Sequence, residues 1–267
     1  MIRNFSLAAG GVIVAALLLL AVAGPGLDAS DPLAINLDHA LAGPSGAHPL
    51  GCDALGRDML ARTVWGARIS VGIAAAVVGV SLVIGSLIGG AAALAGGWID
   101  ELLMRAVDIL LAFPGILLAI ALAAILGPGL VDLVIALAAM GWTGYARLVR
   151  GEILSLRERD YVQAARGLGA TPARLLLRHL LPAVGGPLAV QASFGIGGII
   201  IAEAALSFLG LGIPPPQPTW GGMLDEGRAF LLVAPHLTTV PGLAIGLSVL
   251  GFNFLGDGLA RLFGTRR

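Results

Sequence analysis

The sequence contains no lysine, and all 16 of its basic residues are arginine. A phosphate-binding P-loop, a Schiff base and a serine–lysine dyad each need a lysine, so this chain performs none of these chemistries by itself. Its single cysteine, Cys52, has no partner for an internal disulfide, and its four histidines lack the spacing of a zinc motif. The chain is therefore expected to bind no metal and no cofactor of its own.

Charged residues are also scarce, at 12% of the 267 residues, whereas a soluble domain has about 25%. Apolar residues make up 57%, and the mean hydropathy is +0.94. So little charge cannot cover a surface that faces water, and the excess of apolar residues indicates a lipid environment. Basic and acidic residues are equal at 16 each, so no overall charge favours nucleic acid.

Six stretches are apolar enough to cross a bilayer, which takes about 20 residues as a helix. They are Leu7–Ala23, Ile69–Ala95, Ala106–Leu126, Leu130–Ala146, Ala183–Gly212 and Leu237–Gly256. The first ends in a sequence that resembles a signal-peptidase site, but its long apolar run favours an uncleaved anchor. The fourth, shortened by Asp132, is the weakest. The sequence thus predicts an all-α membrane protein with six transmembrane helices.

Arginine is distributed unevenly between the two sides of this six-span arrangement. If the N-terminus is inside, twelve arginines lie inside and four outside, the latter being Arg57, Arg62, Arg68 and Arg228. Because positively charged loops stay in the cytoplasm, both ends of the chain are predicted to be inside. This places Arg266 inside and Asp38 outside.

The spans divide the chain into two predicted regions. Residues 1–68 hold the first transmembrane helix and an external loop with an interfacial helix near Ala54–Val64, and residues 69–267 form a five-helix core. In a second external segment, the prolines from 214 to 218 predict an extended start, with Trp220 at the level of the lipid headgroups. Within the second span, Ser81, Gly85 and Gly89 lie on one helix face and predict close helix packing.

The cytoplasmic segment 147–182 carries seven arginines and does not belong in lipid. Asp160 is expected to cap a first helix that ends at Gly169. Thr171 is expected to cap a second helix, with Pro172 in its first position and Pro182 at its end. The pattern predicts a helix-turn-helix on the inner membrane face. The alternative is a basic loop that only orients the protein and touches lipid phosphates.

This segment resembles the cytoplasmic "EAA" loop of ABC-importer permeases. The shared residues are Gln163-Ala164-Ala165, Gly169 and Leu181-Pro182, while Gln163 replaces the usual Glu and His179 the usual Ile. Further segments match the dipeptide, oligopeptide and nickel "C" permeases, and they span the chain from about residue 24. These segments are His48–Asp58, Gly66–Ser70, Phe113-Pro114, Leu206–Gly212, Trp220-Gly221 and Gly251–Asp257.

The resemblance implies the type I importer permease fold in the bacterial inner membrane. It also implies a homologous second permease subunit, two ABC ATPase subunits that hold ATP and Mg²⁺, and an extracytoplasmic substrate-binding protein. The cytoplasmic helix-turn-helix would couple the permease to the ATPases, with an apolar face formed by Tyr161, Ala165 and Leu168. The candidate coupling residues are Tyr161, Gln163, Ala164, Ala165, Arg166, Leu168, Gly169 and Pro182.

Polar residues inside the predicted spans are the candidates for a substrate pathway, because such groups are costly in lipid. They are Glu203, Gln191, Ser193 and Asn253. Each has an alternative interpretation as a group that only joins two helices. A di- or oligopeptide is the favoured substrate.

Two other functions compete with peptide import. Nickel import is disfavoured because no His lies in a predicted span and Cys52 is external. A distant alternative is an intramembrane serine protease, with Ser45 in a Gly-Pro-Ser-Gly sequence and His236 or His179 as its base. Ser45, however, lies in a polar external loop, and His179 lies on the other side of the membrane.

Overall fold

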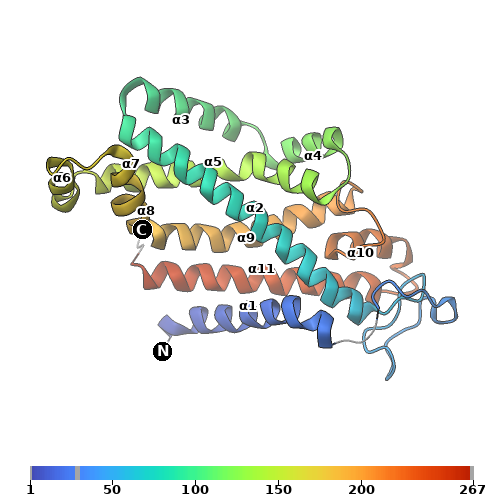
Figure 1. Cartoon of the computed structure of the whole chain (residues 1–267). Helices are drawn as coiled ribbons and strands as arrows, with labels where there is room; N and C mark the ends of the chain where they lie inside the picture. Colours follow the sequence, from blue (N-terminus) through green and yellow to red (C-terminus); the bar gives the residue numbers. More distant parts are fainter. Residues whose placement is uncertain (1, 28–30, 265–267) are drawn as a thin grey trace.

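The computed structural model describes residues 2–27 and 31–264, and these residues form helices and loops without a β-strand (Figure 1). The helices are α1 (Ile2–Leu27), α2 (Met59–Ala95), α3 (Gly97–Ala112), α4 (Gly115–Leu126), α5 (Leu130–Leu156), α6 (Asp160–Gly167), α7 (Pro172–Leu175), α8 (Leu181–Ala183), α9 (Gly185–Phe208), α10 (Trp220–Gly227) and α11 (His236–Leu262). Single turns are formed by η1 (Leu37–His39), η2 (Leu176–Leu180) and η3 (Arg228–Phe230).

Five of the described helices are long and apolar enough to cross a membrane: α1, α2, α5, α9 and α11. Helices α3 and α4 pass the same test only together, and they are bent by 86° at the break between them. Counting the bent pair as one span gives the six predicted spans. The fourth span, α5, is the least apolar of the five single-helix spans, as predicted, but it is a continuous helix of 27 residues and is not shortened by Asp132.

The irregular span is instead the third, predicted as Ala106–Leu126. Phe113 takes an extended conformation, with φ −85° and ψ 139°, directly before Pro114. A residue that precedes proline is driven out of the helical region by the proline ring, which ends α3 and lets α4 start in a new direction. The sequence contained this signal in Phe113-Pro114.

The predicted interfacial helix near Ala54–Val64 is also wrong as a separate element. Residues 54–58 are not helical, and Met59 begins α2, which continues without a break to Ala95. The boundary proposed at residue 68 therefore falls inside one helix. At 1.5 Å per residue, α2 is about 55 Å long, so it is longer than the roughly 30 Å hydrocarbon layer.

The packing face predicted in the second span is confirmed as a contact between α2 and α5. A Cβ added to Gly85 would lie 2.6 Å from the carbonyl oxygen of Trp142, and one at Gly89 would collide with Ala146. Only glycine allows the two backbones to come this close. Around this contact, buried apolar residues from α2, α5 and α9 form the middle of the bundle.

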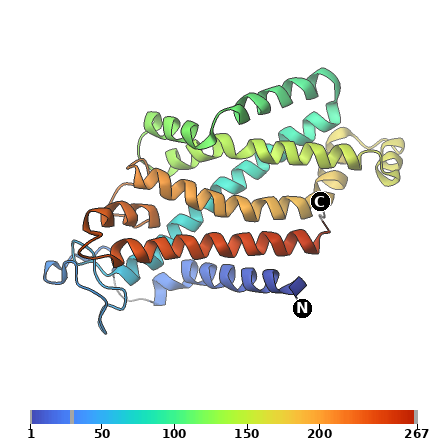
Figure 2. The same cartoon turned by 180° about the vertical axis from the view of Figure 1, so that it is seen from behind.

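The two ends of the bundle differ in character. The start of α1, the end of α11 and helices α6 to α8 lie at one end, while residues 31–58 and α10 lie at the other (Figures 1 and 2). This agrees with an even number of spans. Of the orientation markers, Asp38 is in the second group, and Arg266 lies outside the described residues.

Candidate functional site

The first helix of the cytoplasmic segment is α6, and its two ends are built differently from each other. Arg159, not Asp160, occupies the N-cap position, and Asp160 is the first helical residue, where its charge favours the helix dipole. At the other end, Gly169 has φ +84°, as predicted. The amide of Ala170 donates to Ala165 O at 3.1 Å and that of Gly169 to Arg166 O at 3.0 Å. These two bonds form a Schellman motif, which requires a left-handed residue at this position.

The second helix of the segment begins as predicted. Thr171 caps α7, with its hydroxyl accepting a hydrogen bond from the Arg174 amide at 3.3 Å, and Pro172 occupies the first turn. From α7 the helical run continues through η2, a π-helical turn, into α8, which ends at Ala183, one residue after the predicted end at Pro182. Pro182 has no amide hydrogen to donate within the helix, and the widened π turn lies directly before α8.

Three contacts fix α6 to the rest of the bundle. Val162 is fully buried, in a cluster with residues of α5, α7 and η2. The side-chain amide of Gln163 donates to the carbonyl oxygen of Arg157 at 3.0 Å and closes the turn from α5 to α6. Arg157 in turn donates to the carbonyl oxygen of Ala93 at the end of α2, at 3.3 Å. An ionised Glu in place of Gln163 could not donate this bond.

The outer surface of the segment exposes apolar side chains among its arginines. Leu168 is 90% exposed, and Tyr161 is 47% exposed. Ala165, predicted to share their face, is instead partly buried against the cluster around Val162. Ala164 and Arg166 are exposed. Exposed apolar residues rimmed by charge are typical of a surface that a partner covers.

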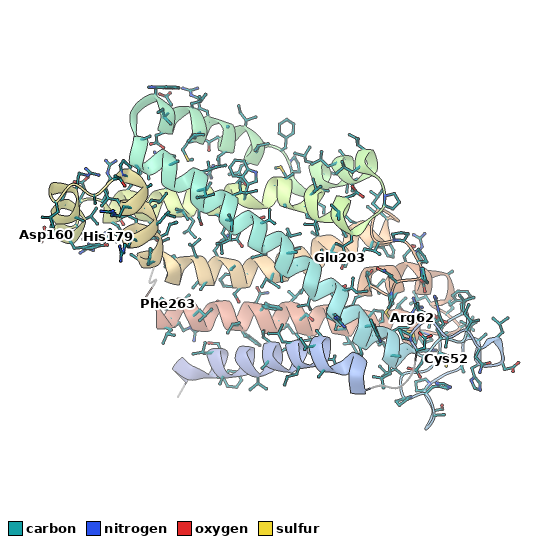
Figure 3. The ribbon with its side chains drawn as sticks, viewed as in Figure 1. Cys52, Arg62, Asp160, His179, Glu203 and Phe263 are labelled. Carbon is teal, nitrogen blue, oxygen red and sulfur yellow. The ribbon has the colours of Figure 1, made fainter. Side chains whose placement is uncertain are left out.

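Glu203, the main candidate in the predicted substrate pathway, lies in the interior of this chain (Figure 3). It is 0% exposed, and Ser207, one turn further along α9, donates its hydroxyl to Glu203 Oε1 at 2.8 Å. Its other oxygen has no hydrogen-bond partner among the described residues. In this conformation a substrate cannot reach the carboxyl group.

Trp220 explains why this part of α9 is covered. It was predicted at the headgroup level, but it is 0% exposed, and its indole nitrogen donates to Thr63 O of α2 at 3.0 Å. The next residue, Gly221, packs so closely on α9 that an added Cβ would lie 2.6 Å from Ala204 Cα. The start of α10 is therefore wedged between α2 and α9.

The remaining pathway candidates are spread along two helices. Ser193 is buried and donates its hydroxyl to the carbonyl oxygen of Phe252 on α11 at 2.8 Å, which is an interhelical bond. Gln191 is exposed, and Asn253 is half-buried. No hydrogen bond joins these three side chains to Glu203 within the described part of the chain, so they do not form one polar site.

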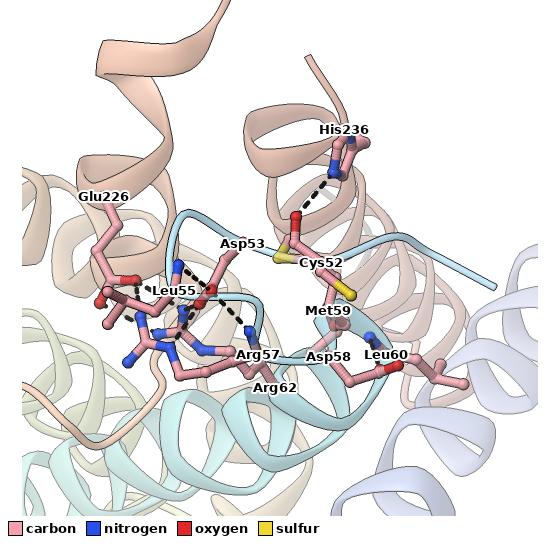
Figure 4. Close-up of polar contacts among 11 residues, drawn as sticks. Cys52, Asp53, Leu55, Arg57, Asp58, Met59, Leu60, Arg62, Glu226 and His236 are labelled. Atoms are coloured by element: carbon pink, nitrogen blue, oxygen red, sulfur yellow. Dashed lines mark hydrogen bonds and ion pairs between the residues drawn. The ribbon is translucent and has the colours of Figure 1, made fainter. Parts of the chain in front are cut away.

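An ionic cluster that the sequence did not indicate lies at the end opposite α6 to α8 (Figure 3), and its contacts are drawn in Figure 4. Arg57 Nε lies 2.6 Å from Asp53 Oδ2, and its Nη2 lies 2.8 Å from Glu226 Oε2. Arg62 contacts Asp53 as well, and its Nη1 lies 2.7 Å from Glu226 Oε2. The cluster balances two arginines against two carboxylates and ties the external loop and α2 to α10. Glu226 lies 164 residues from Arg62, so no local pattern could have revealed the pair.

The loop that contains Asp53 and Arg57 is held in place by further contacts. Asp58 caps α2 through the amides of Leu60 and Ala61, at 2.7 and 3.0 Å, and also contacts His48. Gly56 has φ +72° and its Cα faces the Asn36 carbonyl so closely that no side chain fits. Cys52 is fully buried, and this burial, together with the charges of Asp58 and Asp53, raises the pKa of its thiol.

The proposed nucleophile of the protease alternative, Ser45, is not hydrogen-bonded to either proposed base. The Ser45 hydroxyl accepts a hydrogen bond from the His48 amide at 3.1 Å, and His236 is bonded to the carbonyl oxygen of Cys52 at 3.1 Å. The other proposed base, His179, lies at the end of the molecule opposite to Cys52, and Cys52 belongs to the same loop as Ser45 (Figure 3). Within residues 2–27 and 31–264, no three potential metal ligands come together either.

Comparison with known proteins identifies the family. Residues 81–267 match the family described as "Binding-protein-dependent transport system inner membrane component". The chain belongs to this family of importer permeases. It is a multi-pass protein of the bacterial inner membrane, and permeases of this family work with an ATPase and a substrate-binding protein.

Three relatives of this permease illustrate the match. It is 47% identical to the glutathione transport system permease protein GsiD of Pectobacterium atrosepticum, over 84% of this chain and 74% of the relative. It is 48% identical to GsiD of Shigella dysenteriae, with the same shares covered. With the dipeptide transport system permease protein DppC of Alkalihalophilus pseudofirmus it shares 44% identity, over 94% of this chain and 82% of the relative. None of these names refers to nickel.

Proposed function

We propose that this permease forms a pathway by which di- or oligopeptides enter the cell. The observation that supports this substrate class is the identity of 44–48% to permeases named for a dipeptide and for glutathione, a tripeptide. Nickel is disfavoured, since the spans of the chain present no cluster of imidazole or thiolate ligands in the described residues. The chain works beside a second, homologous permease subunit and above two ATPase subunits.

Segment 147–182 transmits the movement of the ATPases to the spans. Leu168 and Tyr161 supply exposed apolar contacts for a groove on an ATPase, and Arg166 lies beside them. Val162 and Gln163 hold α6 on α5, so that a push on α6 reaches α5 and, through Arg157, the end of α2. ATP is hydrolysed only on the partner subunits, because this chain has no lysine for a P-loop.

Reconstitution tests this function directly. The permease is purified with its partner permease, its ATPases and its binding protein and is placed in liposomes. We expect ATP-dependent accumulation of a radiolabelled dipeptide, no accumulation of radioactive Ni²⁺, and no ATP hydrolysis by this chain alone. Accumulation of Ni²⁺ but not of peptide would show that the nickel alternative is the right one.

A further inference from the structure

A groove of about 550 Å³ opens at the end of the molecule opposite α6 to α8. One face of α2 forms its long wall, and the start of α5 and the loops around residues 31–33 and 217–218 close it. Its volume lies in the range of small-molecule sites, which is about 300–1,000 Å³. Neither the ionic cluster around Arg62 nor Glu203 lines it.

The groove has two charged residues of opposite sign. Arg68 and Asp31 both line it, and neither forms an ion pair within the described part of the chain. The Arg68 guanidinium lies 5.9 Å from the ring centre of Trp65, which also lines the groove and supports the cation there. Gln217 adds a side-chain amide, which can both donate and accept hydrogen bonds.

The rest of the lining is apolar and extends toward the middle of the bundle. Ile69, Gly72, Ile73 and Ala76 follow one another on the same face of α2, with Leu130 and Val134 of α5 opposite. Ala76 lies about 12 Å further along the helix than Arg68. Gly72 has open space where its Cβ would be, so the groove owes part of its width to the missing side chain.

We propose that this groove receives the peptide substrate of the permease. A free peptide carries a carboxylate at one end and an ammonium group at the other, and Arg68 and Asp31 supply the complementary charges. Apolar side chains of the peptide would lie along Ile69, Gly72 and Ile73. The inference rests on the proposed function, because it assigns a site to the same substrate.

The test uses the reconstituted transporter and a dipeptide with a photoreactive diazirine side chain. The dipeptide is present at a concentration that saturates the binding protein. Gly72→Leu fills the groove from a helix position that has room for it. Gly79→Leu is the matched control, since Gly79 lies two turns further on the same face, is equally open and does not line the groove. We expect cross-links in 65–76 and 130–134 of the wild type. Uptake should fall about tenfold or more in Arg68→Gln, because a charge-assisted contact to the peptide is lost. It should fall by a similar factor in Gly72→Leu, because the new side chain occupies the groove. Uptake should stay unchanged in Gly79→Leu.

Asp31→Asn tests the ammonium contact separately. The wild type should take up an N-acetylated dipeptide more slowly than the free one, and the variant should lose this preference. Wild-type uptake of dipeptide with unchanged rates in Gly72→Leu and Arg68→Gln would overturn the inference and leave the proposed function standing. If the wild type imports no peptide at all, the proposed function fails first.

Two other occupants would appear as distinct results. Loss of a bound phospholipid from Gly72→Leu, seen by mass spectrometry with peptide uptake intact, would make the groove a lipid site. Loss of the partner permease from purified Gly72→Leu would make it a subunit interface. Either result contradicts the peptide site.

Discussion

Arg62 carries its charge at 1% exposure and shares Asp53 and Glu226 with Arg57. The charges of these two arginines and two carboxylates cancel only while all four residues are present. Removing one member of a buried ion pair leaves its partner charged and without compensation, which costs about 3–5 kcal/mol. The same residues join three segments that are distant in sequence, so the stability of the external end depends on a few side chains.

Arg62→Met should therefore lower the free energy of unfolding by about 3–5 kcal/mol. The buried thiol of Cys52 provides the measurement. Only the thiolate reacts with maleimide, and burial both shields the thiol and raises its pKa, so the folded protein should label slowly even near pH 8.5, the ordinary pKa of a cysteine. In detergent, Arg62→Met should label at a lower urea concentration than the wild type.

Arg105→Met is the matched control for this measurement. Arg105 pairs with Glu101, but both side chains are largely exposed, so the loss should be about 0–1 kcal/mol. Equal labelling curves for Arg62→Met and Arg105→Met would mean that the external cluster does not stabilise the fold.

At the scale of elements, the α6–α7 turn depends on backbone conformation more than on side-chain contacts. Nothing lies within 4 Å of the position where a Cβ of Gly169 would be, so a larger side chain there meets no steric obstacle. Its φ of +84° is the constraint, because a β-branched residue is strained in that region. The Schellman bonds of Gly169 and Ala170 both depend on this conformation.

Gly169→Val should strain the turn by roughly 1–2 kcal/mol and misdirect α7. The expected result is reduced peptide uptake, with either uncoupled ATP hydrolysis or poor recovery of the ATPase during purification. Binding of the substrate-binding protein at the external face should be unchanged.

Two variants separate this effect from others. Gly167→Val places the same side chain two residues earlier, inside α6, in equally open space and without a positive φ, so it should retain most uptake. Arg174→Gln removes one exposed charge and should also have little effect. If charge alone gives the segment its role, Arg174→Gln will be the more damaging variant and Gly169→Val will transport normally.

At the scale of the whole molecule, the two ends of the bundle are chemically distinct. At the end with α6 to α8, four of the seven arginines of segment 147–182 form no ion pair within the described residues. At the opposite end Arg57, Arg62 and Arg228 are paired, and among the described residues only Arg68 is not. Unpaired positive charge is therefore concentrated at one end, which favours its cytoplasmic placement.

A reporter at each end checks this orientation. Green fluorescent protein fused after residue 267 should fluoresce, because it folds in the cytoplasm, and alkaline phosphatase at the same point should be inactive. Alkaline phosphatase inserted at Asp38 should be active. An active phosphatase after residue 267 would contradict the model of six spans with both ends inside.

Six spans, the left-handed turn at Gly169 that follows α6, and the cap at Thr171 that precedes α7 could all be predicted from the sequence alone. These depend on contacts within a few residues: each transmembrane helix satisfies its own backbone hydrogen bonds, and caps act on the adjacent turn. The break at Pro114 had a local signal as well, but a continuous apolar run concealed it. The family could be recognised from the order of short motifs that this chain retains.

Which polar groups are accessible depends on the packing of segments that are distant in the sequence. Glu203 is hidden because α10 folds back over α9, Arg62 is neutralised by Glu226, and Arg68 and Asp31 line the same groove. The sequence specifies such pairs through the shapes and charges of segments that are far apart in the chain. Hydropathy and helix periodicity report only on neighbouring residues, so they identify a charge inside the bundle but not the partner that the fold gives it.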